Sequence, residues 1–316
     1  MKTILVTLPL EERHKVLLAG SLGDRAPEYT FLYTDGEAPA PDQLRDAAVI
    51  IGAPDPALLG QAEKLEWLQL SIAGADAYAA PGVLPPDVVL TNAVGAYGLT
   101  VSEHMLAQTL SVIRRFGQYG RNQVRHEWRH MGRISSIEGS VIAVLGLRDI
   151  GGSYARKVKA LGAYVIGLRQ HQRPKPDWLD EQYTIDRLDE ILPRADIVAM
   201  VLPGGEGTYH IMDGDRLGRM KPGAFLINAG RGGAVDPAAL KAALREGRLG
   251  GAALDVTEPE PLPPEDELWD FDNVILTPHA AGHLFLPETL NRIVAIAGDN
   301  LSRRVRGEPL RNKVAR

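Results

Sequence analysis

The chain has 316 residues, of which 45% are hydrophobic and 24% are charged, and 35 basic against 40 acidic residues give a net charge of −5. This length exceeds what one hydrophobic core usually supports, so we expect two domains. The acidic balance argues against a general nucleic-acid-binding protein. The absence of cysteine excludes disulfides and cysteine-ligated metal sites, and it fits a reducing compartment.

The longest apolar runs, such as VIAVLGL at 141–147, are far shorter than the roughly 20 residues that a membrane-spanning helix needs. The amino-terminal MKTILVTLPLEER has one lysine and a brief apolar stretch before charges arrive. This pattern indicates a strand rather than a signal peptide. We therefore expect a cytoplasmic protein.

Short apolar runs alternate with amphipathic helical patterns, which is typical of βαβ units in a parallel sheet. The first third predicts five strands, at 4–8, 29–33, 48–52, 67–71 and 88–92. A long helical pattern follows over about 100–116. Six further strands are expected at 141–147, 164–169, 196–203, 224–230, 252–256 and 273–278. Their near-continuous apolar runs suit strands buried on both faces.

Two later helices have informative positions. Asp236 can cap a helix that has Pro237 at its first position, and Gly247 follows its last turn. The final helix, over about 287–306, comes after the second strand series has ended, so it can cross back to the first domain. We therefore predict an α/β protein of two doubly wound parallel-sheet domains with a cleft between them. Segments 1–97 and 285–316 would form one domain, and 98–284 the other.

The strand at 141–147 runs into GLRDIG and then a helical pattern, the context of the dinucleotide-binding fingerprint G-x-G-x-x-G. Gly146 and Gly151 fit its first and third glycines, but Arg148 stands at the second. A two-of-three match also fits a plain βα turn, and the five further strands favour the nucleotide interpretation. Arg148 could reach a cofactor phosphate or obstruct binding, and the sequence leaves both open.

The next strand ends at Arg169, where such domains usually carry an acidic residue that accepts hydrogen bonds from the adenosine ribose. A guanidinium binds a 2′-phosphate bidentately, whereas a carboxylate repels it. We therefore expect NADP to be preferred, with NAD as the other candidate. The alternative is that Arg169 and Arg173 belong to a solvated basic loop.

Arg231, Glu260 and His279 each follow an apolar run, in the segments INAGRGGAVD, ALDVTEPEPL and ILTPHAAG. Side chains at the carboxyl ends of neighbouring parallel strands converge on one crevice. A cation, a carboxylate and an imidazole meeting there form an acid/base centre with an anion clamp. Taken singly, Arg231 could be a structural salt bridge and Glu260 simple loop acidity. His279 and His283 form an H-x₃-H pair, but no third ligand has convincing spacing, so we expect no metal.

The whole chain resembles the D-isomer-specific 2-hydroxyacid dehydrogenase family. The resemblance rests on SIAGAD at 71–76, VSEH at 101–104, the LGLRDIG turn, LP at 202–203, KPGAFLINAGRGGAVD at 221–236, GAALDV at 251–256, EPEPLP at 258–263 and NVILTPH at 273–279. The 221–279 block is the most specific part. The glycine fingerprint departs most from the family pattern, because of Arg148.

The resemblance implies that His279 is the general acid/base, which gives its proton to the carbonyl oxygen as hydride reaches the carbon. Glu260 would orient His279 through a hydrogen bond and favour its protonated form. We choose Glu260 over the nearby Glu258 because Glu260 lies five residues after Asp255, where the family's acid lies. Arg231 would hold the substrate carboxylate and polarise the keto oxygen.

The same matching implies further binding residues. The backbone amides of Ala73 and Gly74 would help bind the substrate carboxylate from the other domain. Asp255 and the backbone at Ala229 would hold the nicotinamide carboxamide. The remaining cofactor-binding positions are Asp149 and Ile150 in the turn, and Leu202, Pro203, Thr208, Ala281 and Gly282 along the groove.

These features predict a Rossmann-like dinucleotide-binding domain, a substrate-binding domain and an NADP-preferring reductase of short 2-keto acids. Glyoxylate or hydroxypyruvate are the expected substrates, by analogy with family members that carry arginine on the second strand. The family also implies a homodimer, with no nucleic-acid or membrane partner. The rival is a non-catalytic nucleotide-sensing or interaction protein on the same fold, suggested by Arg148. The intact arginine, glutamate and histidine set argues against it.

Overall fold

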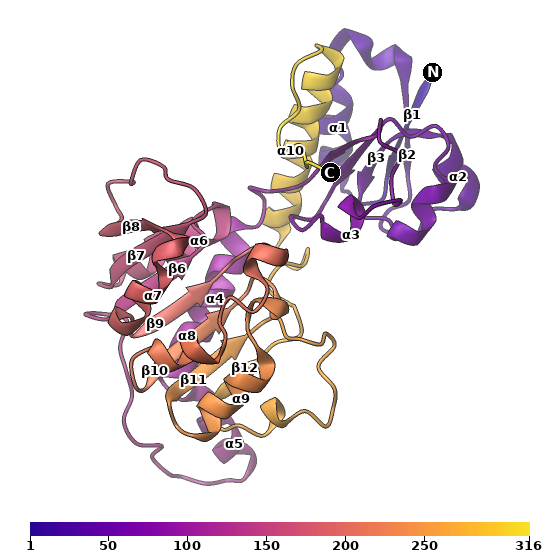
Figure 1. Cartoon of the computed structure of the whole chain (residues 1–316). Coiled ribbons are helices and arrows are strands. Elements are labelled where there is room, and N and C mark those ends of the chain that lie inside the picture. The colour runs from indigo at the N-terminus through magenta and orange to yellow at the C-terminus, as the bar shows by residue number, and fades with distance from the viewer. The chain divides into compact units, whose positions relative to one another are not determined.

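The computed structural model describes residues 1–316, which divide into two compact units. Unit 1 comprises Met1–Tyr97 together with Leu284–Arg316, and unit 2 comprises Gly98–His283. In Figure 1 the yellow carboxyl-terminal helix accordingly packs on the indigo amino-terminal segment. The binding roles expected for the two domains stay predictions. None of the helices is both long enough and apolar enough to span a membrane.

Unit 1 contains a five-stranded sheet in the order β2-β1-β3-β4-β5, and every neighbouring pair is parallel. This is a flavodoxin-like doubly wound order. The strands are Lys2–Val6 (β1), Tyr29–Tyr33 (β2), Ala47–Gly52 (β3), Trp67–Leu70 (β4) and Val89–Thr91 (β5). All of β3 and β4 is buried, as expected for central strands covered on both faces. The five strands predicted for this part of the chain are confirmed.

Helices cover the sheet of unit 1: Glu12–Gly20 (α1), Pro41–Asp46 (α2), Asp76–Ala79 (α3) and Pro287–Val305 (α10). The predicted final helix is α10, and it packs against α1. A Cβ on Gly298 of α10 would lie 2.8 Å from Leu17 Cδ2 and 2.7 Å from Ser21 Oγ. This close approach explains why a glycine stands in the middle of a long helix.

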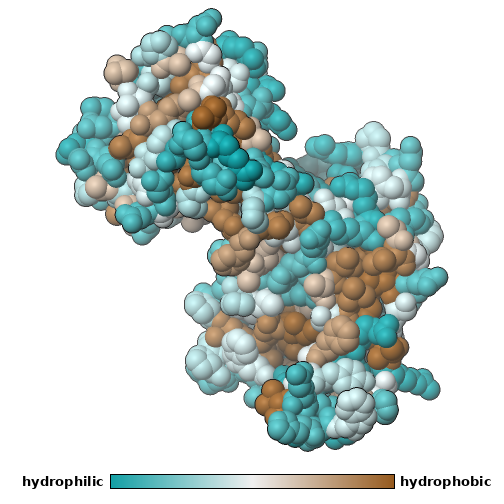
Figure 2. Space-filling view, turned by 180° about the vertical axis from the view of Figure 1, so that it is seen from behind, coloured by the Kyte–Doolittle hydropathy of each residue, from teal (hydrophilic) through white to brown (hydrophobic).

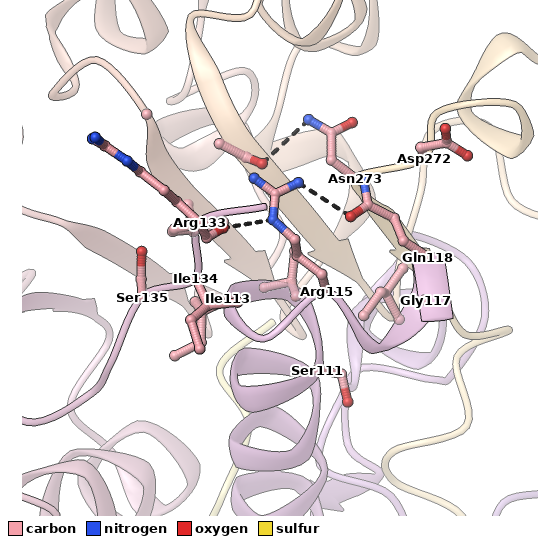
Figure 3. A pocket seen from close by; sticks show the side chains of 15 residues that line it. Ser111, Ile113, Arg115, Gly117, Gln118, Arg133, Ile134, Ser135, Asp272 and Asn273 are labelled. Atoms are coloured by element: carbon pink, nitrogen blue, oxygen red, sulfur yellow. Dashed lines mark hydrogen bonds between the residues drawn. The ribbon is translucent and has the colours of Figure 1, made fainter. Parts of the chain in front are cut away.

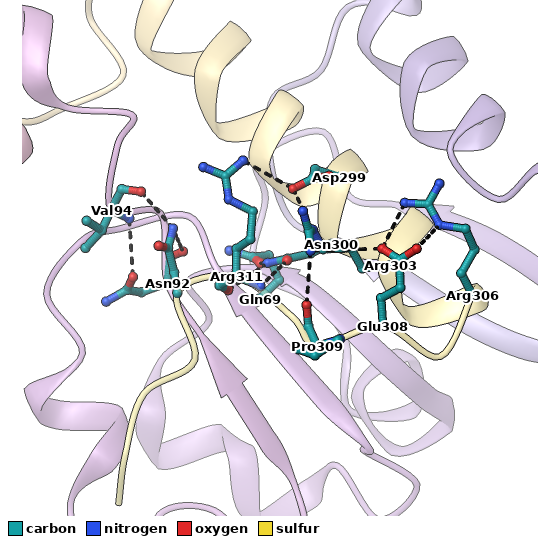
Figure 4. A network of polar contacts seen from close by, with 11 residues as sticks. Gln69, Asn92, Val94, Asp299, Asn300, Arg303, Arg306, Glu308, Pro309 and Arg311 are labelled. Atoms are coloured by element: carbon teal, nitrogen blue, oxygen red, sulfur yellow. Dashed lines mark hydrogen bonds and ion pairs between the residues drawn. The ribbon is translucent and has the colours of Figure 1, made fainter.

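A buried polar network fastens α10 to the sheet (Figure 4). Asn300 is fully buried, and its amide donates to Gln69 Oε1 on β4 at 2.8 Å. The same amide group donates to the carbonyl of Arg311 at 3.2 Å, while Asn300 Oδ1 accepts the Arg311 N–H at 2.8 Å. Thr91 on β5 also donates to Gln69 Oε1, at 2.7 Å. Asn300 therefore joins the last segment of the chain to its fourth strand.

Unit 2 contains a seven-stranded parallel sheet in the order β12-β11-β10-β9-β6-β7-β8. Its strands are Val141–Leu145 (β6), Tyr164–Arg169 (β7), Glu181–Thr184 (β8), Ile197–Met200 (β9), Ala224–Asn228 (β10), Leu249–Leu254 (β11) and Val274–Leu276 (β12). Six of these were predicted. The edge strand β8, with the sequence EQYT, was missed because it has no apolar run. The predicted α/β class of doubly wound parallel sheets is confirmed.

The helices of unit 2 are Gly98–Ile113 (α4), Phe116–Val124 (α5), Asp149–Ala160 (α6), Leu188–Ile191 (α7), Gly214–Arg219 (α8) and Pro237–Arg245 (α9). The helix predicted over about 100–116 ends earlier, because Arg115 adopts a left-handed conformation with φ of 63° and starts a second helix. The capping of α9 is confirmed, since the Asp236 side chain accepts the N–H groups of Ala238 and Ala239. Gly247 follows α9 with φ of 67°.

The strand order of unit 2 reverses between β6 and β9. The chain moves outward from β6 through β7 to β8, then returns to β9 on the other side of β6. In such sheets ligands bind outside the carboxyl ends of the strands at this reversal. The segments after β6, β9, β10 and β11 are therefore where a site should lie.

Candidate functional site

The turn after β6 requires glycine at two positions. Gly146 has φ of 95°, and a Cβ there would lie 2.5 Å from the carbonyl oxygen of Val201. A Cβ on Gly151 would lie 1.8 Å from the carbonyl oxygen of Gly146. No side chain fits at either position without moving backbone. These are the first and third glycines of the predicted fingerprint, and they keep the turn and the start of α6 in close contact.

The amino end of α6 has hydrogen-bonding capacity left over. The backbone N–H groups of Asp149, Ile150 and Gly151 donate no hydrogen bond, and the first intrahelical bond runs from Gly152 to the Arg148 carbonyl at 2.8 Å. Asp149 Oδ2 is buried without a partner. Free N–H groups at a helix amino end bind phosphate oxygens. The turn therefore has the donors that a dinucleotide pyrophosphate needs, and the binding roles of Asp149, Ile150 and Gly151 stay predictions.

Arg148 stands immediately before α6 as its capping residue. Its side chain is exposed and makes no hydrogen bond or ion pair. The tight approach that a Cβ would block occurs at Gly146 and Gly151 rather than at Arg148. The arginine at the second fingerprint position is thus compatible with the folded turn.

Arg169 is the last residue of β7, at the same edge of the sheet. Its Nε donates to Gln182 Oε1 on β8 at 3.1 Å. Burial, together with the nearby charge of Arg173, lowers the pKa of the Arg169 guanidinium. Neither arginine forms an ion pair. Two unneutralised guanidinium groups therefore lie at the carboxyl end of β7.

The predicted groove residues lie in the segments after β9 and β10. Leu202 is buried and Pro203 is exposed, and the Thr208 hydroxyl donates to the Pro203 carbonyl at 2.7 Å. The Ala229 N–H donates to the carbonyl of Met200 at 3.1 Å. A Cβ on Gly230 would lie 2.7 Å from the backbone nitrogen of Leu202. The two segments therefore touch backbone to backbone.

His279 and Glu260 form a hydrogen-bonded pair. Nδ1 of His279 lies 2.6 Å from Glu260 Oε1, and about half of the imidazole side chain (48%) is exposed. His279 has φ of 50°, and its N–H donates to the Asp255 carbonyl at 2.8 Å. A carboxylate on Nδ1 fixes the ring and leaves Nε2 to exchange a proton with a ligand.

Asp255 holds the backbone around His279. It is 2% exposed, and its two carboxylate oxygens accept the N–H groups of Ala280 at 2.9 Å and Ala281 at 3.1 Å. The Thr277 hydroxyl donates to Asp255 Oδ1 at 2.6 Å. His104 Nε2 lies 3.4 Å from the same oxygen. Asp255 therefore builds the turn that carries the imidazole, and its predicted contact with a carboxamide stays a prediction.

Sequence reasoning missed the residues around Asp255. Nε2 of His104 lies 3.0 Å from the Thr277 hydroxyl, and Gln108 donates to the same hydroxyl at 2.9 Å. Both residues lie on α4. The VSEH segment shows the histidine, but nothing in the sequence places it beside Thr277, 173 residues away in the chain. Only the packing of α4 on the sheet does so.

Arg231 follows β10 in a loop fixed by a buried asparagine. Asn228 is 1% exposed, donates to the Arg231 carbonyl at 2.9 Å and accepts the Gly230 N–H at 3.0 Å. A Cβ on Gly232 would lie 1.8 Å from the Thr257 carbonyl oxygen. The arginine loop thus packs directly on the segment that leads to Glu260.

A second histidine–carboxylate pair lies beside this contact. His210 Nε2 is 2.7 Å from Glu258 Oε2, and the His210 N–H donates to the Gly233 carbonyl at 2.7 Å. Tyr209 stacks on the His210 ring with the ring centres 4.0 Å apart. Burial and the charge of Glu258 raise the pKa of Tyr209. Glu258 is thus occupied by His210, while Glu260 faces His279.

The other predicted residues are distributed as follows. Ala73 and Gly74 lie in unit 1, in the loop after β4, where the Ala73 carbonyl accepts the Asn92 amide at 2.9 Å; their substrate-binding role stays a prediction. Ala281 is buried, and its carbonyl accepts the Thr100 hydroxyl at 3.2 Å. Gly282 follows it directly.

No group of three or more histidine, cysteine or acidic side chains is arranged to hold a metal ion.

A cavity lies elsewhere, at the amino ends of β10, β11 and β12 (Figure 3). Its volume is about 200 Å³, and Phe225, Gly250 and Ile275 form part of its wall. Arg115 lies among the lining residues, donating to the Arg133 carbonyl at 2.6 Å and to Gln118 at 3.1 Å. This cavity is at the opposite edge of the sheet from His279 and Arg231.

Comparison with known proteins places these features in a family. Residues 106–281 match the model of the D-isomer specific 2-hydroxyacid dehydrogenase, NAD binding domain. The chain is 33% identical over 286 residues to the glyoxylate/hydroxypyruvate reductase B of Erwinia tasmaniensis, which covers 86% of this chain and 87% of that protein.

Two solved structures share the fold over almost the whole chain. A D-isomer specific 2-hydroxyacid dehydrogenase family protein from Aeromonas salmonicida is 31% identical, with a TM-score of 0.85 and 99% of both chains covered. An NADPH-dependent glyoxylate/hydroxypyruvate reductase from Sinorhizobium meliloti, in complex with NADP and sulfate, is 28% identical with a TM-score of 0.81. That match covers 99% of this chain and 98% of the other.

Proposed function

We propose that this chain, which belongs to the D-isomer specific 2-hydroxyacid dehydrogenase family, is an NADP-preferring reductase of short 2-keto acids. Family membership makes it an NAD(P)-dependent oxidoreductase of 2-hydroxy acids. We propose three further properties: the preference for reduction, the D configuration of the product and the identity of the keto acid. The observation that carries it is the His279–Glu260 hydrogen bond at 2.6 Å.

His279 supplies the proton in this proposal. Its Nδ1 is engaged by Glu260, so Nε2 is the ring atom that delivers a proton to the oxygen of the bound keto acid. The negative charge of Glu260 stabilises the imidazolium that precedes this transfer. In the reverse direction the neutral ring accepts the hydroxyl proton. Asp255 fixes the backbone on which the imidazole sits.

Arg231 holds the substrate anion. Its position after β10, in a loop fixed by Asn228, suits a guanidinium that pairs with the substrate carboxylate and withdraws charge from the keto oxygen. Ala73 and Gly74 are proposed to add backbone N–H groups to the same carboxylate. Unit 1 would then serve substrate binding, and unit 2 dinucleotide binding.

The nucleotide binds, in this proposal, along the carboxyl edge of the unit 2 sheet. The free N–H groups at the start of α6 would hold the pyrophosphate, and Arg169 would hold the 2′-phosphate. Leu202, Pro203 and Thr208 would line the groove. The bound nicotinamide supplies the hydride for the reaction. The relative from Sinorhizobium meliloti, whose structure contains NADP, supports NADP, and NAD is the second candidate.

Glyoxylate and hydroxypyruvate are the proposed substrates. Both are short 2-keto acids with one carboxylate, which suits a site with one clamping arginine. The names of the relatives from Erwinia tasmaniensis and Sinorhizobium meliloti support the same pair. The rival hypothesis of a non-catalytic nucleotide sensor is disfavoured, because a purely binding protein has no need of the hydrogen-bonded His279–Glu260 pair.

Oxidation of NADPH and of NADH with a panel of 2-keto acids tests the proposal, with His279→Ala as the control. We expect turnover with glyoxylate or hydroxypyruvate, loss of activity in His279→Ala and a preference for NADPH. Arg169→Asp should shift the preference toward NADH. Nucleotide binding without turnover of any keto acid would identify a sensor instead. Equal efficiency with NADH would contradict the cofactor preference.

We also propose a cytoplasmic homodimer formed through unit 2. Figure 2 shows hydrophobic side chains in several patches on the visible face of this unit. Large apolar side chains lie exposed on α4, on α5 and in the segment that follows α5: Leu110, Phe116, Val124, Trp128 and Ile134. Exposed apolar patches mark protein contacts. Light scattering after gel filtration should give twice the chain mass, and Val124→Ser with Trp128→Ser should give the monomer.

A further inference from the structure

Gln182 on the edge strand β8 contacts both arginines at the end of β7. Its Oε1 accepts a hydrogen bond from Arg169 Nε at 3.1 Å, and its Nε2 donates to the Arg173 carbonyl at 2.5 Å. One amide therefore fixes the guanidinium of the first arginine and the backbone of the second. Because β7 and β8 pair in parallel, with Gly167 opposite Gln182, the glutamine has a defined place beside the end of β7.

The acidic residues of this region are engaged by other cations. Glu181, next to Gln182, pairs with Arg194 and accepts the hydroxyl groups of Tyr164 and Tyr183. Asp180 pairs with Lys159, with the two atoms 2.7 Å apart. No carboxylate lies within ion-pair distance of Arg169 or Arg173. Burial and the charge of Arg173 lower the pKa of Arg169, and neither arginine has a protein counterion.

We propose that Gln182 is the residue that fixes the preference for a 2′-phosphorylated nucleotide, by holding Arg169 and Arg173 as an uncompensated two-arginine anion site. This inference rests on the proposed dinucleotide function and adds a residue to it. The Nε atom of Arg169 is used by Gln182, so its terminal nitrogens stay available for two phosphate oxygens. The anchored backbone of Arg173 keeps the second guanidinium near the same phosphate.

A neutral amide is the side chain that performs both tasks. Its oxygen accepts a hydrogen bond from Arg169 and its nitrogen donates one to the Arg173 carbonyl, so both polar atoms of the amide are used. A carboxylate at the same position could accept from Arg169, but it would neutralise the guanidinium and could not donate to the carbonyl. Gln182→Glu therefore neutralises the arginine site and also removes the hydrogen bond to the Arg173 carbonyl. Both changes should weaken phosphate binding, while the volume of the side chain stays nearly the same.

The test compares two fragments that differ only in the phosphate concerned, 2′,5′-ADP and 5′-ADP. Calorimetry on the full chain gives their dissociation constants without any turnover. For the unmodified protein we expect 2′,5′-ADP to bind about tenfold or more tightly than 5′-ADP, the size of one charge-assisted contact. In Gln182→Glu the ratio should fall to about one, with the affinity for 5′-ADP unchanged. Gln182→Ala should give an intermediate ratio.

Gln172→Glu is the matched control, since it adds the same charge to the loop that carries Arg173 and makes no hydrogen bond in the structure. It should keep most of the preference for 2′,5′-ADP. An unchanged 5′-ADP affinity shows that each variant is folded. If the unmodified protein prefers 2′,5′-ADP but both Gln182 variants keep that preference, the role of Gln182 is refuted while the NADP assignment stands. If the unmodified protein shows no preference, the NADP assignment itself fails.

Discussion

Glu260 Oε1 lies 2.6 Å from Nδ1 of His279, whereas the neighbouring acid Glu258 contacts His210. Two histidine–carboxylate pairs thus use glutamates only two residues apart. The pair at His279 leaves Nε2 of the ring without a partner in the protein, as a proton donor to substrate requires. The pair at His210 connects loops instead.

Replacing Glu260 by Gln should lower kcat for keto-acid reduction about 100-fold, because an amide cannot stabilise the imidazolium that donates the proton. The affinity for NADPH should stay the same, since Glu260 is assigned no contact with the nucleotide. Steady-state kinetics and fluorescence titration measure the two quantities. Glu265→Gln, in the same acidic loop, is the control. Activity of Glu260→Gln within a factor of two of the unmodified enzyme would remove Glu260 from the mechanism.

Two adjacent glycines on α6 should respond in opposite ways to alanine. A Cβ on Gly151 would lie 1.8 Å from the Gly146 carbonyl oxygen, whereas the nearest atom to a Cβ on Gly152 is the Leu147 carbonyl oxygen at 3.5 Å. Gly151→Ala should lower the free energy of unfolding by about 1–3 kcal/mol and weaken NADPH binding, because the turn must open. Gly152→Ala should be neutral or stabilising by up to about 1 kcal/mol. Urea unfolding and NADPH titration measure both effects for each variant. Equal changes in Gly151→Ala and Gly152→Ala would show that the turn is not tight at Gly151.

The His210–Glu258 pair joins the segments that carry Arg231 and Glu260. His210 donates its N–H to the Gly233 carbonyl, and its ring contacts Glu258. We expect His210→Ala to reduce kcat/KM about tenfold through displacement of these loops, with NADPH affinity retained. His210→Gln, which keeps a donor, should recover most of the loss. His130→Ala, at an exposed histidine, serves as the control, and a His210→Ala enzyme of full activity would show that the pair does not position the site.

Asn300 should contribute strongly to the stability of unit 1. Asn300→Leu leaves the Arg311 N–H without its acceptor and removes the donor to Gln69. Leaving buried polar groups unpaired costs about 1–3 kcal/mol, and the unfolding free energy should fall by that amount in chemical denaturation. Arg292→Gln, which breaks only a solvent-accessible ion pair with Glu288 on the same helix, should cost less than about 1 kcal/mol. Equal losses from the two variants would contradict the role of Asn300.

The Glu181–Arg194 pair predicts a pH-dependent contribution to stability. The hydrogen bond from Arg194 is the main cause that lowers the pKa of Glu181 from 4.5 to about 2. Because the folded pKa is the lower one, the stabilisation is complete above pH 4.5 and is lost as the pH falls toward 2. Glu181→Gln should therefore unfold more easily by about 1 kcal/mol at pH 7. The difference from the unmodified protein should vanish near pH 2, and a difference that grows on acidification would disprove it.

Much of the fold could be predicted from apolar runs, because central parallel strands such as β3 and β9 are buried on both faces. The strand β8 could not, since EQYT lies at an edge of the sheet and carries Glu181, the charge that pairs with Arg194. The break between α4 and α5 was also hidden, because Arg115 has no intrinsic preference for the left-handed conformation that it adopts.

The candidate site divides in the same way. Strand ends show where Arg231 and His279 stand, because parallel strands share one carboxyl edge. The hydrogen bonds of Asp255 to Ala280 and Ala281, and the contact of Gln182 with Arg169, depend on side chains that approach from other elements. Such contacts have no signature in the local sequence, so the residues that make them can be identified only once the packing of the elements is known.

The split of unit 1 between the two ends of the chain has a consequence for biosynthesis. When residue 283 leaves the ribosome, every strand and helix of unit 2 has been made, while the sheet of unit 1 still lacks α10. Domains generally fold as units during synthesis, so unit 2 should reach its folded state first although unit 1 starts at residue 1. The five strands of unit 1 must wait, with the face that α10 covers open to solvent, until Asn300 is translated and reaches Gln69. The nascent chain is therefore exposed to aggregation at this face until residues 284–316 have been made.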